Sequence, residues 1–274
     1  MVIRVLESVN GMRRLYFRIL GPLEVSGVDG PMRIGGWKRR ALLIALLTRP
    51  NDVVAVDRLL EWLWPAGTPR SSISTLQAHV SMLRRTLEPT RAPWSPPTVL
   101  MTVPPGYLLR TTTAELDTLH FEELLRAGRL ALERRDPERA RPPLGEALGL
   151  WRGDALADVT LLDAAQAEIR RLEELRLAAL VLRIEADLAL RRHLDVVAEL
   201  MHLIVVYPLH EQFYAQLMLA LCRSGRRAEA LAVYGRARTV LRREMGLEPG
   251  PELRRVESAI LTDPQECEPG LFLI

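Results

Sequence analysis

The change in composition near residue 111 is the feature that most constrains the fold of this chain. The stretch 90–113 is rich in Pro and Thr, whereas the residues that follow form long segments rich in Ala, Leu, Arg and Glu. Pro and Thr clusters mark loops, and long runs of strong helix formers indicate helices. With 274 residues, the chain is long enough for about two domains. We predict a flexible N-terminus at 1–14, a mixed domain at 15–111, a helical domain at 116–262 and a tail at 263–274.

The two halves of the chain also differ in net charge. Residues 1–111 hold 15 basic and 7 acidic side chains, and residues 112–274 hold 22 and 27, so their net charges are +8 and −5. A basic N-terminal half favours contact with a polyanion such as nucleic acid. A solvated basic surface has the same composition, so the charge alone leaves both interpretations open.

The residue types exclude several classes of enzyme. Of the 37 basic residues only Lys38 is a lysine, and its surroundings do not match a phosphate-binding loop. The histidines and the two cysteines show no metal-ligand spacing, and the GxSxG and GxGxxG motifs are absent. We therefore expect no enzyme activity, no metal and no cofactor. Two cysteines are too few for a disulfide framework, and the longest apolar run, residues 41–47, is too short to span a bilayer. A cytoplasmic protein without a membrane partner is the expectation.

Residues 15–111 carry patterns of short strands and helices. Strands are expected within 15–25 and 28–34, followed by helices over 37–48, 58–64 and 71–87, with Asp57 as the N-cap of the second helix. Two strands over 98–103 and 107–110 flank Pro104-Pro105-Gly106 and predict a β-hairpin. Strands, three helices and a terminal hairpin in this order are the layout of a winged helix-turn-helix.

The third of these helices carries the pattern most relevant to function. Its apolar residues recur at helical spacing and predict one buried stripe, formed by Ile73, Leu76, Val80, Leu83 and Leu87. The opposite face holds mainly small and polar side chains: Ser71, Ser74, Thr75, Ala78, Ser81, Met82 and Arg85. Such a face after a tight turn suits a recognition helix in the major groove of DNA. An ordinary amphipathic helix with a plain solvent face is the alternative.

Four side chains near these helices are open to two interpretations. We interpret His79, at the flank of the stripe, as a satisfied and partly buried histidine rather than a base contact. Trp62, Trp64 and Trp94 are interpreted as packing residues, although Trp94 lies in a Pro-rich loop where an exposed role is the alternative.

Several motifs resemble a known family of DNA-binding regulators. His79-Val80, Leu83-Arg84-Arg85 and Leu87-Glu88-Pro89, followed by Thr102-Val103 and Gly106-Tyr107, resemble the DNA-binding domain of OmpR-type response regulators. The stretches 20–25, 36–43 and 104–107 resemble more closely the Streptomyces antibiotic regulatory protein family. In that family such a domain is joined to a bacterial transcriptional activation domain. The resemblance covers residues 15–262.

The resemblance implies roles for individual N-terminal residues. The third helix would lie in the major groove, and the side chains facing the groove would be Ser74, Thr75, Ala78, Ser81 and Met82. Phosphates and sugars would be held by Arg84, Arg85, Thr102 and Tyr107. Lys38 and Arg39 would touch the DNA backbone, and the DNA-binding set also includes Arg70 and Ser71 at the start of the third helix. Two-component members often place Arg where this chain has Ser81 and Met82, so we expect less guanine readout and weak binding by one copy. The loop of Trp64, Pro65, Ala66, Gly67 and Thr68 corresponds to the one that contacts RNA polymerase in OmpR-type activators. A plain turn set by two prolines is the alternative.

The C-terminal half shows internal repetition. Helices are expected over 117–133, 136–150, 163–190, 193–207, 210–223, 226–245 and 249–261. Ala230-x3-Tyr234-x2-Ala237 fits the second helix of a tetratricopeptide repeat, with similar patterns from Val197 and from Ala140. An all-α solenoid follows, which binds peptides or serves as a rigid dimerisation platform. The stretches 151–156, 172–177 and 246–253 resemble the activation domain of the same family, which implies dimerisation and transcription activation.

The sequence thus leads to a mainly α protein with one leading functional hypothesis. We expect a transcriptional activator that binds direct repeats in double-stranded DNA near promoter −35 elements, as a homodimer or as cooperative copies. It would recruit RNA polymerase with its sigma factor, and the family implies control of secondary-metabolite (antibiotic) biosynthesis genes. A ligand- or peptide-responsive regulator or repressor is the first alternative, and a repeat scaffold that binds protein or RNA is the second. Translation could start at Met1 or Met12.

Overall fold

The computed structural model describes residues 14–159 and 162–262, and the chain separates into two compact units. Unit 1 is formed by Met1–Glu123 and Ala147–Arg176, and unit 2 by Leu124–Glu146 and Leu177–Ile274. Three helices therefore contribute residues to both units: α4 (Asp117–Glu133), α5 (Pro137–Gly149) and α6 (Asp163–Ala189). The predicted flexible N-terminus, except its last residue, and the predicted tail lie outside the described residues.

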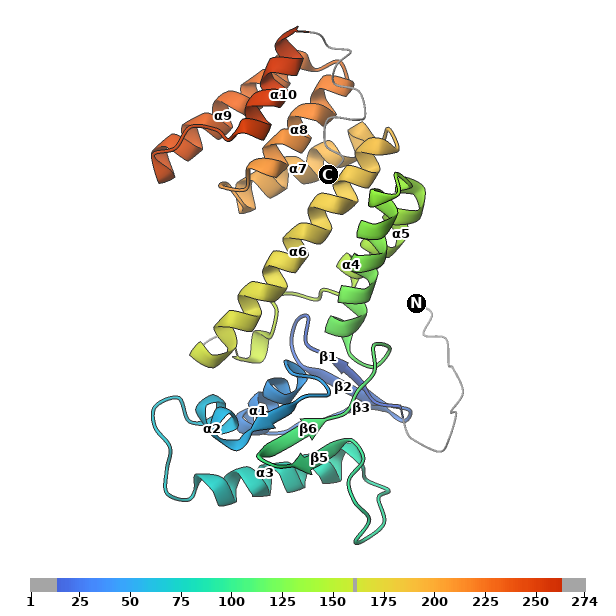
Figure 1. Ribbon diagram of the computed structural model, residues 1–274, viewed down its shortest axis with the longest axis vertical. Coiled ribbons are helices and arrows are strands. Elements are labelled where there is room, and N and C mark those ends of the chain that lie inside the picture. Colours follow the sequence, from blue (N-terminus) through green and yellow to red (C-terminus); the bar gives the residue numbers. More distant parts are fainter. Residues whose placement is uncertain (1–13, 160–161, 263–274) are drawn as a thin grey trace. The chain divides into compact units, whose positions relative to one another are not determined.

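Unit 1 contains the predicted winged helix (Figure 1). Its first sheet is an antiparallel meander of β1 (Tyr16–Arg18), β2 (Glu24–Gly27) and β3 (Gly30–Met32). Three helices follow, α1 (Trp37–Leu47), α2 (Val56–Leu63) and α3 (Ser72–Leu87), and α1 packs on both of the others. Every residue from Ala41 to Leu47 is buried, so α1 forms the centre of the core. The mainly α fold class, with an N-terminal winged helix-turn-helix, is confirmed.

The wing is the hairpin of β5 (Leu100–Val103) and β6 (Gly106–Leu109), and β4 (Val53–Ala55) extends it in the order β4-β6-β5. Ala55 lies opposite Gly106 in the β4–β6 register. A Cβ atom at Gly106 would lie 1.9 Å from the carbonyl oxygen of Val54, so only glycine permits this approach. The glycine at this position therefore fixes the hairpin against the strand that enters α2.

The predictions of one buried-stripe residue and of one N-cap in this unit are wrong. Ile73 is 54% exposed, whereas Ser72 is 4% exposed and takes the edge of the buried stripe. At 100° per residue both flank the stripe, so apolarity alone cannot choose the buried one. Asp57 is not an N-cap either: α2 begins one residue before it, after Ala55, and Asp57 lies in the first turn.

A segment of the C-terminal half completes unit 1. The N–H groups of Ile19 and Leu20 donate to the carboxylate of the buried Asp117 at 2.9 and 3.0 Å. Further along the chain, the N–H of Arg152 donates to the carbonyl of Leu20 at 2.8 Å, and that of Leu156 to Ile19 at 3.0 Å. The guanidinium of Arg152 lies 2.9 Å from Glu24. The turn between β1 and β2 thus finds its hydrogen-bond partners about 100 and 130 residues away, outside the winged helix itself.

Asp158 forms a second connection of this kind. Its carboxylate accepts hydrogen bonds from the N–H of Leu23 and, at 2.7 Å, from Nε of Arg40 on α1. Phe121 on α4 is buried and contacts the ring of Trp151 edge to face, with centroids 5.6 Å apart. These contacts explain why residues 147–176 group with the N-terminal unit.

Unit 2 is entirely helical within the described residues (Figure 1). Its last four helices are α7 (His193–Val206), α8 (Glu211–Arg223), α9 (Arg227–Met245) and α10 (Pro251–Thr262). Every residue of α8 from Phe213 to Cys222 is buried, because α7, α9 and α10 all pack around it. The predicted helix ends agree with the structure to within two residues. Among the described residues, no helix is long and apolar enough to cross a membrane.

The approach of α4 and α5 in unit 2 depends on Gly128. A Cβ atom there would lie 2.4 Å from the side chain of Leu144, which is fully buried.

The same unit holds the buried Asp187 of α6 in a network of arginines. Its carboxylate accepts from Arg141 at 2.6 Å and from Arg183 at 2.9 Å. The network satisfies a charge that burial would otherwise penalise.

Glu185 on α6 predicts a pH dependence of the stability of unit 2. Burial, with the nearby charge of Glu252, raises the pKa of Glu185 from 4.5 to about 7. The folded state therefore binds this proton more tightly than the unfolded state, so the stabilisation is present below pH 4.5 and is lost as the pH rises to about 7. We expect the free energy of unfolding to fall by about 1–2 kcal/mol over that range, after allowance for solvent screening. Urea unfolding at both ends of the range measures it, and Glu185→Gln should flatten the profile. An unchanged slope in that variant would contradict the assignment.

Candidate nucleic-acid interface

The solvent face of α3 carries the small and polar residues that the sequence pattern places there. Ser74, Ala78, Ser81 and Arg85 are exposed and Thr75 is half-buried. The hydroxyl groups of Ser74 and Thr75 both donate to the carbonyl of Ser71 at 2.9 Å, which leaves their oxygens able to accept. Met82 is 39% exposed on the same face. No acidic residue lies anywhere on α3.

One further exposed side chain lies at the edge of this face although the pattern did not single it out. Gln77 is exposed beside Ala78. Glutamine is one of the side chains that can read adenine by paired hydrogen bonds. Gln77 lies about 100° around the helix from the centre of the buried stripe, and this position in the sequence pattern could have identified it as a surface residue.

Arg84 connects α3 to the wing. Its Nε donates to the carbonyl of Leu100 at 2.8 Å, and its Nη2 donates to the hydroxyl of Thr102 at 2.7 Å. The guanidinium also lies 6.0 Å from the centre of the Tyr107 ring. Partial burial lowers the pKa of Arg84, although the group stays protonated. Arg84 therefore holds the wing, whereas its neighbour Arg85 extends into solvent. Tyr107 is 7% exposed, which leaves little of its ring for an external ligand.

The start of α1 adds a second group of cations. Nζ of Lys38 lies 4.3 Å from the centre of the Trp64 ring, an attractive cation–π contact. Arg39 reaches α3, where its Nη1 lies 3.5 Å from Sδ of Met82. The structure thus brings the first turn of α1 next to the recognition face. Arg70 is exposed just before α3.

The loop between α2 and α3 is exposed and anchored at one end. Trp64 is half-buried under Lys38, and the following residues are exposed: Pro65, Ala66, Gly67 and Thr68. Trp62 is 3% exposed, as expected of a packing residue. Trp94 is fully exposed, so its interpretation as a packing residue is wrong.

His79 differs from its prediction as well. Both ring nitrogens are buried, and neither has a hydrogen-bond partner within the described residues. Burial lowers the pKa of His79, and the charges of Arg39 and Lys38 lower it further. The prediction of a histidine with satisfied hydrogen bonds is therefore wrong. The ring is desolvated, and this environment favours the neutral form of the imidazole.

No cluster of three side chains that could bind a metal ion occurs in the described part of the chain.

Comparison with known proteins assigns the family. The bacterial transcriptional activator domain matches residues 116–261, and the C-terminal domain of transcriptional regulatory proteins matches residues 36–109. Regulatory protein DnrI of Streptomyces peucetius is 36% identical over 260 residues, which cover 94% of each chain. Regulatory protein AfsR of Streptomyces coelicolor is also 36% identical, but the match spans 93% of this chain and only 25% of AfsR.

A solved structure gives the same result. The structure of Mycobacterium tuberculosis EmbR in complex with a low affinity phosphopeptide superimposes with a TM-score of 0.87 at 32% identity. The match covers 93% of this chain and 68% of EmbR. The chain therefore belongs to the Streptomyces antibiotic regulatory protein family of transcriptional regulators, in which an OmpR-type winged helix is joined to a helical bacterial transcriptional activator domain.

Proposed function

We propose that this protein activates transcription by binding direct repeats in double-stranded DNA through α3 and the wing. The observation that carries the proposal is the acid-free, small-residue face of α3 with cations on both sides. Lys38 and Arg39 lie at the start of α1, Arg70 lies before α3, and Arg85 lies near its end. Cations in this arrangement neutralise backbone phosphates, which supplies most of the affinity for any duplex.

Sequence preference would come from the residues between those cations. Ser71, Ser74, Thr75, Ala78, Ser81 and Met82 face the major groove in this proposal, joined by Gln77. Short side chains let the helix backbone approach the base edges, and hydroxyl groups bind donors or acceptors there. Because no arginine lies in the middle of this face, one copy binds weakly. Two copies on adjacent repeats, as a homodimer or as cooperative neighbours, then supply the affinity.

The wing has a supporting part in this proposal. Arg84 and Tyr107 keep the hairpin against α3, and Thr102 presents its exposed side to the sugar-phosphate backbone. Because the Arg84 guanidinium already donates hydrogen bonds to Leu100 and Thr102, it acts mainly by positioning the wing and not as an independent phosphate ligand.

We further propose that the exposed loop from Trp64 to Thr68 contacts RNA polymerase with its sigma factor, and that the regulated genes serve secondary metabolism, such as antibiotic biosynthesis. The contact between Lys38 and the Trp64 ring supports this proposal, because it connects the start of the loop to the first turn of α1, which would lie on the DNA.

Selection and sequencing of genomic fragments bound by the purified protein tests this function. At moderate salt with competitor DNA, we expect a short motif repeated at one helical turn, about 11 base pairs, near promoter −35 elements. Featureless binding that disappears with salt would contradict sequence-specific recognition.

A single substitution on α3 gives the same selection a sharper outcome. Thr75→Ala should change the preferred base at one position of the motif, with a loss of about 1–3 kcal/mol of discrimination there. Thr239→Ala on α9 is the matched control, because its hydroxyl also donates to the carbonyl four residues back, at 2.8 Å. If both variants select the wild-type motif unchanged, Thr75 does not face the bases.

A further inference from the structure

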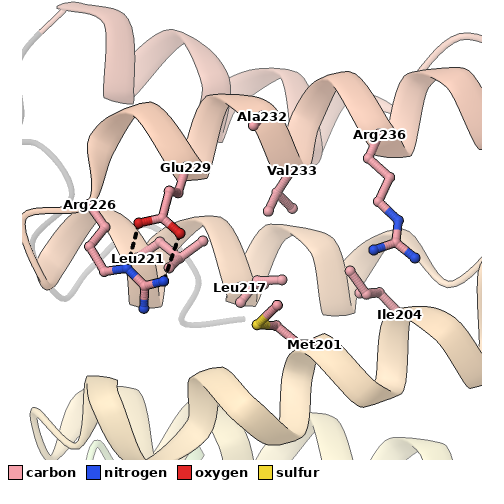
Figure 2. Close-up of a pocket in the computed structure, with 9 residues that line it drawn as sticks. All are labelled: Met201, Ile204, Leu217, Leu221, Arg226, Glu229, Ala232, Val233 and Arg236. Carbon is pink, nitrogen blue, oxygen red and sulfur yellow. Dashed lines mark hydrogen bonds and ion pairs between the residues drawn. The ribbon is translucent and has the colours of Figure 1, made fainter.

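An apolar groove of about 240 Å³ lies between α7 and α9 in unit 2, with α8 as its floor (Figure 2). Met201 of α7, Leu217 of α8 and Val233 of α9 point toward one another in it. Met201 is 52% exposed, and Leu194 and Val205 continue the exposed apolar face of α7 at 69% and 60%. This unit therefore presents a contiguous apolar surface that is unusual for a surface without a partner.

Basic side chains lie at both ends of the groove. Arg226 lies at one end, where it donates to Glu229 at 2.8 and 2.7 Å, and Arg236 lies at the other (Figure 2). Within the described residues, no carboxylate is close enough to form an ion pair with Arg236. A separate pocket includes Arg191, Arg192 and Arg223 in its lining, together with one carboxylate, Asp195, and Arg223 is only three residues before Arg226 in the chain. An occupant of this surface would need apolar side chains and acidic ones.

The described chain ends close to this surface. Nη2 of Arg227 donates to the carbonyl of Leu261 at 2.8 Å, so the last turn of α10 lies beside the first turn of α9. Thr262 is the last described residue, and residues 263–274 follow it in the sequence. Extended chain spans about 3.3 Å per residue, so this segment can reach roughly 40 Å. The groove from Arg226 to Arg236 rises only about 15 Å along α9.

The same segment has the composition that the surface requires, and in the matching order. Asp263, Glu266 and Glu268 come first, and the apolar run Leu271-Phe272-Leu273-Ile274 follows. We propose that residues 263–274 dock on unit 2 of the same chain, with the acidic residues against the arginines of the α8–α9 turn and Leu271–Ile274 in the groove. Burial of the apolar run and of the groove lining drives the docking, and the charges set its direction. Any other partner of this groove must displace the segment.

Peroxide oxidation of two methionines tests the docking in the full chain. Met201 lines the groove and Met245 lies at the end of α9, and the two side chains are almost equally exposed, at 52% and 57%. Thioether oxidation follows accessibility, so docking should make Met201 react at least about fivefold more slowly than Met245, as measured by peptide mass spectrometry. The double substitution Phe272→Asp and Leu273→Asp should remove that difference and leave the rate of Met245 unchanged.

Two outcomes would overturn the proposal. One is equal oxidation of Met201 and Met245 in the natural chain, which means that the groove is open. The other is protection of Met201 that disappears on dilution, because a second copy rather than the chain's own segment would then cover the groove. Protection that is independent of concentration and is lost in the double variant supports docking in the same chain.

Discussion

Replacing Asp117 with Ala is expected to lower the free energy of unfolding of unit 1 by about 3 kcal/mol. The substitution leaves the N–H groups of Ile19 and Leu20 without their acceptor in a buried place, and each such group costs about 1–3 kcal/mol. Arg152 also loses a carboxylate 3.8 Å away. In a unit of this size the midpoint of thermal unfolding should fall by roughly 6–12 °C, measured by calorimetry or circular dichroism.

Two further variants show whether the acceptor or the charge of Asp117 matters. Burial raises the pKa of Asp117, against the opposing effects of the two N–H groups and Arg152. Asp117→Asn keeps one acceptor oxygen and avoids the desolvated charge, so we expect it to cost less than half as much as Asp117→Ala. Asp163→Ala is the control, because Asp163 is exposed in the first turn of α6 and its loss should cost under about 1 kcal/mol. Asp117→Ala within 1 kcal/mol of the natural protein would show that the turn finds other partners.

Replacing Arg84 and Arg85 together is expected to weaken binding to every duplex about 30-fold, or about 2 kcal/mol. The two side chains act by different routes. Arg85 contacts a phosphate in the proposed complex, so Arg85→Ala alone should lower the slope of log affinity against log salt by about 1. Arg84→Ala removes the charged hydrogen bonds to Leu100 and Thr102, so affinity should fall through a displaced wing with a smaller change in slope.

The control for this pair comes from the chain itself. Arg242 and Arg243 are adjacent, exposed and in the last turn of α9, as Arg84 and Arg85 are adjacent in the last turn of α3. Alanine at both control positions removes the same charge from the protein but should leave duplex affinity within about twofold. Equal losses from the two pairs, measured by titration at several salt concentrations, would mean that net charge rather than α3 determines binding.

The sequence predicts the elements of this protein well because their ends carry strong local signals. Pro137, Pro208 and Gly225 interrupt runs of helix formers, so the helix ends of the C-terminal half follow directly from the residues. The polar face of α3 follows from helical periodicity in the same way. The buried stripe of α3 was predicted wrongly only at its edge, where helical periodicity places Ile73 and Ser72 equally close to the stripe.

Contacts between distant segments could not be predicted in this way. The hydrogen bond from Ile19 to Asp117 joins residues 98 apart, and no local pattern marks Asp117 as its acceptor. Likewise, the position of Arg84 in the third helix suggested a phosphate contact, but its direction depends on where the wing lies. The unpartnered nitrogens of His79 depend on the packing of α1 against α3. Tertiary geometry decides these roles.

The connection of residues 147–176 to the first sheet limits how this family can exchange its parts. A fragment that ends at residue 111 would lose Asp117, Arg152 and Asp158, which are the partners of the β1–β2 turn and of Arg40. A chimera that places this winged helix on the helical domain of a relative would therefore need to keep the segment through Arg176, or to take both surfaces from one parent. Recombination between such regulators should preserve these pairs together, so the unit of inheritance is larger than the unit that contacts DNA.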